Sequence, residues 1–190
     1  MDNFFSKPLS KPSKKGNNVV DGSGNKLHGY NNRIAGKSNT LVGADSTILG
    51  DLNKAFGLSN TIFGSKNVIK KGSRNKIKGS ENRLEGNDNT MVGNKNMVQG
   101  HKNTLIGDLN QIKGHNNTLV GDQNNIAGHS NTALGDRNSL LGNKNAVNGS
   151  DNRIKGDENS INGNKNQVSG NQNNVKQDNN RVAGNQNSVD

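Results

Sequence analysis

The chain has 190 residues, of which 26% are hydrophobic and 3% aromatic, with 25 Gly and a formal net charge of +10. A roughly spherical domain of this length needs nearly half of its residues apolar to fill a core, so this composition excludes an ordinary globular domain. Two classes remain: a disordered chain, and a repeat protein whose thin core runs along one axis.

Residues 1–15 form a basic segment before the repeats, which we expect either to cap the first coil through Phe4, Phe5 and Leu9 or to be disordered. It carries the one cluster of basic residues in the chain, at Lys7, Lys11, Lys14 and Lys15. No apolar run is long enough for a signal peptide or for a membrane span of roughly 18 residues. The sequence as written therefore predicts a cytoplasmic protein that binds no membrane, or an extracellular one if a signal was removed.

From residue 16 to residue 190 the chain repeats a unit of seven residues, x-x-N-x-h-x-G, where h is aliphatic or Met. The 25 units keep their phase except for one extra residue in SKNVIKKG, before Gly72, and a lapse of Gly at Gln177. Asn occupies its position in every unit but one, where Ser46 replaces it. Spacing this regular indicates a repeat fold and excludes disorder.

Each unit predicts one short strand and one corner. Asn and the aliphatic residue are two apart, so on a strand both side chains point to the same side. Gly gives the backbone freedom for a corner, which the next two residues complete. A coiled coil is excluded because its heptads need two apolar positions and avoid Gly. Two units then close a coil of 14 residues, and we expect an all-β solenoid of 12 to 13 coils and about 60 Å in length over residues 16–190.

The interior of this solenoid should hold a line of aliphatic side chains beside a line of Asn. Stacked Asn side chains can hydrogen-bond from coil to coil and so satisfy buried amides without water. Alternatively, the Asn serves the conformation of the corner. Its constant spacing from the aliphatic residue favours the interior ladder.

Alternate units lie on opposite faces of the solenoid, and the two faces differ. One face is mostly polar and charged. The other presents columns of Thr and of aliphatic or aromatic residues, interrupted by Lys76 and Lys78, and is the candidate binding surface: Thr47, Leu49, Thr61, Phe63, Thr90, Val92, Thr104, Ile106, Thr118, Val120, Thr132 and Leu134. The β-propensity of Thr and Val would enrich both faces equally. Enrichment on one face therefore indicates an interaction surface.

A flat grid of methyl and hydroxyl groups without pockets or charges fits an extended, periodic partner. The surface of an ice crystal is one such partner, and a second copy of the chain, giving a homo-oligomer or scaffold, is the other. A third hypothesis is a basic rod that binds polyanions. Nucleic acid is disfavoured because one Tyr and four Phe provide no stacking platform for bases.

The segments NTLVG, NTMVG, NTLIG and NTALG resemble the repeat of the grass ice-recrystallisation-inhibition proteins, a family of plant antifreeze proteins. The resemblance extends over about residues 16–190. It implies a left-handed β-roll with an internal Asn ladder, which binds ice through one flat face, here the Thr and aliphatic columns. The chain also resembles, more weakly, the β-roll heads of bacterial trimeric adhesins, in which an apolar column can be a subunit interface.

Histidines and aspartates also recur at intervals of 14 residues, His101, His115 and His129 on one corner and Asp108, Asp122 and Asp136 on the other. Stacked imidazoles could bind a metal, but polar residues are common at corners and we expect no metal site and no cofactor. The chain contains no Cys. Every candidate acid, base or nucleophile belongs to the repeat, so the sequence predicts a protein that is not an enzyme.

Overall fold

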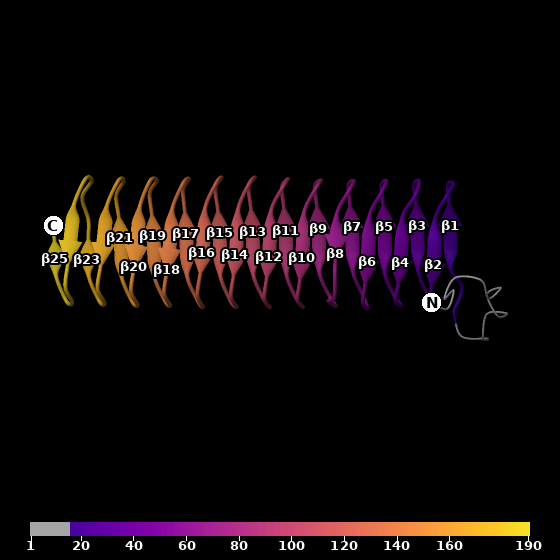
Figure 1. The fold of residues 1–190 in the computed structure, drawn as a ribbon, viewed down its shortest axis with the longest axis horizontal. Helices are drawn as coiled ribbons and strands as arrows, with labels where there is room; N and C mark the ends of the chain where they lie inside the picture. Colours follow the sequence, from indigo (N-terminus) through magenta and orange to yellow (C-terminus); the bar gives the residue numbers. More distant parts are fainter. Residues whose placement is uncertain (1–15) are drawn as a thin grey trace, which may run out of the picture.

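The computed structural model of the protein describes residues 16–190, which form a rod of stacked coils with 25 short strands and, in that range, no helix (Figure 1). Each coil contributes one strand to each of two parallel sheets, which lie on opposite sides of the rod. The predicted all-β solenoid with two strands per coil is therefore confirmed. The predicted N-terminal segment, with Phe4, Phe5, Leu9 and the four lysines, lies outside the described residues.

Odd-numbered and even-numbered strands separate into two sheets, as the alternation of the two faces predicts. Sheet A has 13 strands: β1 Val19–Asp21, β3 Arg33–Ala35, β5 Thr47–Leu49, β7 Thr61–Phe63, β9 Lys76–Lys78, β11 Thr90–Val92, β13 Thr104–Ile106, β15 Thr118–Val120, β17 Thr132–Leu134, β19 Ala146–Asn148, β21 Ser160–Asn162, β23 Asn174–Val175 and β25 Ser188–Val189. Sheet B has 12 strands: β2 Lys26–His28, β4 Thr40–Val42, β6 Lys54–Phe56, β8 Val68–Ile69, β10 Arg83–Glu85, β12 Met97–Gln99, β14 Gln111–Lys113, β16 Asn125–Ala127, β18 Ser139–Leu141, β20 Arg153–Lys155, β22 Gln167–Ser169 and β24 Arg181–Ala183.

The core is a double column of the central strand residues, one column from each sheet. From Ile34 to Val182 every one of these side chains is buried, and neighbours in register, such as Leu105 and Leu119, pack on each other from coil to coil. The column is only one side chain wide in each sheet. This is why a chain with so few apolar residues can still exclude water from a core along its whole length.

Buried Asn side chains form the predicted ladder beside the aliphatic columns. Asn117 is typical: its Oδ1 accepts hydrogen bonds from the backbone N–H of Asn131 at 2.9 Å and from Asn131 Nδ2 at 3.1 Å. Its own Nδ2 donates to Asn103 Oδ1 at 3.1 Å and to the carbonyl of Gly128 at 2.9 Å. The interior ladder is therefore confirmed, and its Asn also binds the adjacent corner through a side-chain hydrogen bond. The left-handed residue of the corner is Asn116, with φ 58°, and not Asn117.

Each corner combines a Gly with a second residue in the left-handed region. Gly107 has φ 128°, and a Cβ placed on it would overlap the carbonyl oxygen of Gly121 in the next coil, so no other residue fits. Two residues later, Leu109 has φ 60°, and the corresponding residue of almost every unit is also left-handed. Asn and Asp tolerate this region best. Leu109 and Arg137 nevertheless adopt the left-handed conformation. The geometry of the coil therefore determines the backbone conformation at this position, whichever side chain it carries.

A further hydrogen-bond ladder runs along the corners and was not predicted. The residue after Gly uses a short acceptor side chain to bind the backbone N–H of its counterpart in the preceding coil. Asp122 Oδ1, for example, accepts from the N–H of Asp108 at 2.7 Å. Only near the N-terminal end do residues without such an acceptor, such as Ala44 and Leu58, take this position. The polar corners therefore hold the coils together rather than merely facing solvent.

The two irregularities of the repeat remain local. The extra residue is accommodated where β8 ends, at Lys70 and Lys71, and the register of the central residues continues from Ile69 to Leu84. At Gln177 the corner lacks its Gly, and the carbonyl of Gln177 does not accept from Asn166 Nδ2 as the carbonyl of Gly156 does from Asn145 Nδ2. Asn166 Nδ2 is accordingly the one buried side-chain nitrogen or oxygen without a partner within residues 16–190.

Candidate functional site

The outer surface of sheet A contains the twelve residues predicted as a binding surface, in two parallel columns. We call them the threonine face: Thr47, Thr61, Thr90, Thr104, Thr118 and Thr132 in one column, and Leu49, Phe63, Val92, Ile106, Val120 and Leu134 in the other. Within strands β11 to β17, each Thr pairs in register with the next Thr. The strand spacing of a sheet puts neighbours of one column about 4.8 Å apart, and the two columns are about 6.6 Å apart.

Exposure varies along the face in a way that the sequence does not reveal. Thr104, Thr118 and Thr132 are exposed, together with Ile106 and Leu134, which keep 44% and 40% of their surface accessible. Thr47, Thr61 and Thr90 are half-buried instead. Each of these three lies beside a long basic side chain, Arg33 or Lys76, in a neighbouring strand. The Thr column is therefore freely accessible only in its C-terminal half, whereas the other column is also exposed at Phe63 (44%) and Val92 (37%).

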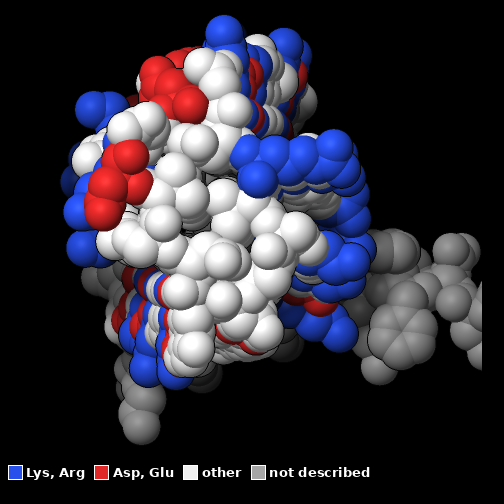
Figure 2. Space-filling model, turned by 90° about the vertical axis from the view of Figure 1, so that its left-hand side faces the viewer, with Lys and Arg blue, Asp and Glu red and all other residues white. Residues whose placement is uncertain are grey.

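Sheet B presents a different surface. Its outward residues include Arg83, Lys113, Arg153 and Lys155, and no column of a single residue type forms. Figure 2 looks along the rod from its C-terminal end. It shows Lys and Arg side chains that project outward in rows along the rod, with Asp and Glu among them. The contrast between the two sheets confirms that alternate units build chemically different walls.

Several charges at the corners pair along the rod axis. Arg74 Nε lies 2.6 Å from Asp88 Oδ1 in the next coil, and Arg137 and Asp151 form the same pair at 2.6 Å. The hydrogen bond and charge of each arginine hold the pKa of its aspartate below the ordinary value. Exposed pairs of this kind add little stability. Both pairs lie at the corners and not on the threonine face.

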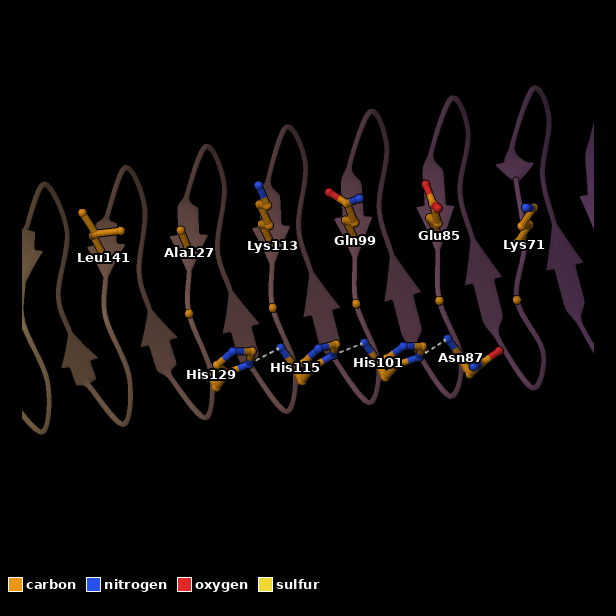
Figure 3. Close-up of a pocket in the computed structure, with 15 residues that line it drawn as sticks. Lys71, Glu85, Asn87, Gln99, His101, Lys113, His115, Ala127, His129 and Leu141 are labelled. Atoms are coloured by element: carbon orange, nitrogen blue, oxygen red, sulfur yellow. Dashed lines mark hydrogen bonds between the residues drawn. The ribbon is translucent and has the colours of Figure 1, made fainter.

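The three histidines form a stacked column on the corner that leads from sheet B to sheet A. Their ring centroids are 4.9 and 5.0 Å apart with an interplanar angle of 12°. Figure 3 shows the column on one side of a shallow groove, with Glu85, Gln99 and Lys113 along the other side. Each Nδ1 accepts from the backbone N–H of the residue one coil earlier, as His115 Nδ1 does from His101 at 2.9 Å. The imidazoles thus belong to the corner ladder.

This arrangement requires neutral imidazoles, because an imidazolium carries hydrogen on both nitrogens and cannot accept. Partial burial and the neighbouring charges of His101 and His129 lower the pKa of His115 below its ordinary value. Within residues 16–190, no group of three or more His, Cys, Asp or Glu is placed to hold a metal ion.

We expect the protein to lose stability as the pH falls from about 7 to about 5. The pKa of His115 is lower in the folded chain than in the unfolded one, so its contribution to the free energy of unfolding is fully present above the unfolded pKa and is lost as the pH falls through the folded pKa. Loss of the hydrogen bond that His115 Nδ1 accepts should lower the free energy of unfolding by about 1 kcal/mol. Urea unfolding followed at a series of pH values measures the effect.

The control replaces His101, His115 and His129 with Asn, the residue that takes the same position at Asn87 and Asn143. Asn143 Oδ1 accepts the corresponding bond from His129 at 2.9 Å and does not titrate in this range. The triple variant should keep its stability across the same pH range. Equal losses in both proteins would show that the column is not the titrating element.

The part of the chain that the structure describes has no helix long and apolar enough to cross a membrane. No curated protein is similar enough in sequence to match the chain. A family model described as the grass antifreeze beta roll matches twice, over residues 13–114 and 106–190, and so covers nearly the whole chain. The proteins of this family bind ice and are not a class of enzymes. On its repeat, its two-sheet coil and this match, the chain belongs to the grass antifreeze β-roll family.

Proposed function

We propose that the protein adsorbs to ice through the threonine face of sheet A and thereby inhibits recrystallisation. The observation that carries the proposal is the uncharged outer surface of β11, β13, β15 and β17. On it each Thr pairs in register with the Thr of the next strand, and each outward aliphatic residue pairs with the aliphatic residue of the next strand. No comparable surface occurs on sheet B within the described residues.

The chemistry of the two columns suits a crystalline water surface. Methyl and larger aliphatic groups order the water above them, while hydroxyl groups anchor that water by hydrogen bonds. The hydrogen-bonded ladders of Asn and of the corners keep the strands in fixed register, so little conformational entropy is lost on binding. Adsorbed molecules would pin the growing ice front between them, and no chemical step is involved.

A splat-cooling assay on the purified 190-residue chain tests the proposal. In annealed films of ice we expect grains to stay small in the presence of the folded protein and to coarsen in the presence of a globular protein of equal mass concentration. Coarsening at the control rate at every concentration would overturn the proposal.

A second copy of the chain is the other partner that the exposed aliphatic column could fit, which would make the protein a self-associating scaffold. Sedimentation velocity over a range of concentrations separates the two functions. A monomer that inhibits recrystallisation supports adsorption through a free face. A dimer that dissociates when the threonine face is charged, without activity on ice, supports self-association instead.

A further inference from the structure

Two lysines interrupt the threonine face at β9. Lys76 takes the position of a Thr and pairs in register with Thr61 on one side and Thr90 on the other. Lys78 takes the position of the aliphatic residue between Phe63 and Val92. Both side chains are exposed. The face is thus divided into a short block on β5 and β7 and a longer block on β11 to β17.

The interruption changes shape as well as charge. A shallow hollow opens at β9, lined by Thr61, Phe63, Lys76, Lys78, Thr90 and Val92. Thr61 and Thr90, which flank Lys76, are half-buried, whereas Thr104 and Thr118 further along the same column are exposed. The surface is therefore neither flat nor uniformly accessible where the two blocks meet.

The ammonium groups also keep their own water. Within residues 16–190, Lys76 and Lys78 form no ion pair that would offset their charge. Placing an unpaired ammonium against a partner strips its hydration shell, which opposes binding at that point of the face. A rigid partner that needs a continuous surface would contact one block or the other, but not both.

From these observations we infer that Lys76 and Lys78 limit the strength of ice binding by confining adsorption to β11–β17. The inference rests on the proposed function of the threonine face. The unbroken block spans three strand intervals, about 14 Å, whereas a face continuous from β5 to β17 would span six, about 29 Å. When two binding surfaces lie on one rigid support, contact through the first brings the second to the same partner. The second contact is then intramolecular, and the affinity rises by more than the added contact area alone would give.

The test is the double variant Lys76→Thr, Lys78→Val, which continues both columns through β9. We expect the lowest concentration that inhibits recrystallisation to fall by about tenfold or more. The matched control is Arg153→Thr, Lys155→Val, which changes the same two strand positions and the same charge on β20 of sheet B. The control should stay at the wild-type value.

The outcomes separate the inference from the function on which it rests. Inactivity of the wild-type protein and of both variants would overturn the proposed function. An active wild type with no gain in the β9 variant, or with an equal gain in the β20 control, would overturn the inference alone. A β9 variant that sediments as an oligomer without gaining activity on ice would also overturn it, since the lysines would then act against self-association.

Discussion

Replacing Thr104 and Thr118 with Lys should abolish inhibition of recrystallisation while leaving the rod folded. The two residues pair in register on β13 and β15, in the middle of the uncharged block, and both are exposed. Two ammonium groups placed there would have to lose their hydration on contact with ice, which disfavours adsorption by several kcal/mol. We expect the concentration needed for inhibition to rise by about a hundredfold or beyond the measurable range.

The same assay on Gln111→Lys, Asn125→Lys provides the control. These residues also pair in register on neighbouring strands, β14 and β16, and are exposed, but on sheet B. The two variants therefore add the same charge at the same strand position on opposite faces. Full activity in the sheet A variant, or equal loss in both, would exclude the threonine face as the ice-binding surface. Circular dichroism should show unchanged strand content in both.

The largest loss of stability is expected for Asn117→Ala. The side chain is 1% exposed and joins three coils, so its removal leaves the N–H of Asn131 and the carbonyl of Gly128 without these partners inside the rod. Unsatisfied buried groups and the cavity together should lower the free energy of unfolding by about 3–5 kcal/mol. Hydrogen exchange at the Asn131 amide reports the local opening, and urea unfolding reports the total.

Two further variants calibrate this loss. Asn125→Ala removes the same side chain from an exposed strand position and should change stability by less than about 0.5 kcal/mol. Asn117→Ser should give an intermediate loss, because Ser46 already shows how a hydroxyl serves in the ladder. Its Oγ accepts from the N–H of Asn60 at 3.0 Å but cannot supply the amide donor. A fully stable Asn117→Ala protein would show that the Asn ladder contributes no net stability.

Most of the fold follows from the heptad phase alone. The spacing of Asn and the aliphatic residue predicts that both point inward, and Asn117 and Leu119 are buried side by side. The separation of odd and even units predicts two unlike sheets, which the pairing of Thr104 with Thr118 and of Gln111 with Asn125 confirms. These predictions succeed because successive side chains of a strand point to opposite sides, and the Gly marks where each strand gives way to a corner.

The corners could not be predicted in the same detail. The left-handed conformation of Leu109 is imposed by hydrogen bonds to neighbouring coils, which the residue type does not encode. His115 and Asp122 look interchangeable as polar corner residues, yet each is there as an acceptor for a particular backbone N–H. The sequence does carry a signal for this ladder. After Gly64 every residue that follows the unit Gly, or Gln177 in its place, is Ser, Asn, Asp or His.

The alternation of the two sheets also limits how the rod can change in length. Each unit contributes the same Asn and the same buried aliphatic residue, so the interior does not distinguish an odd unit from an even one. Deleting one unit of seven residues before Thr90 would preserve that interior but transfer every later threonine from sheet A to sheet B. Deleting 14 residues would shorten the rod by one coil and keep each side chain on its own side. Insertions and deletions can therefore keep the threonines together on one face only when they add or remove two units at a time.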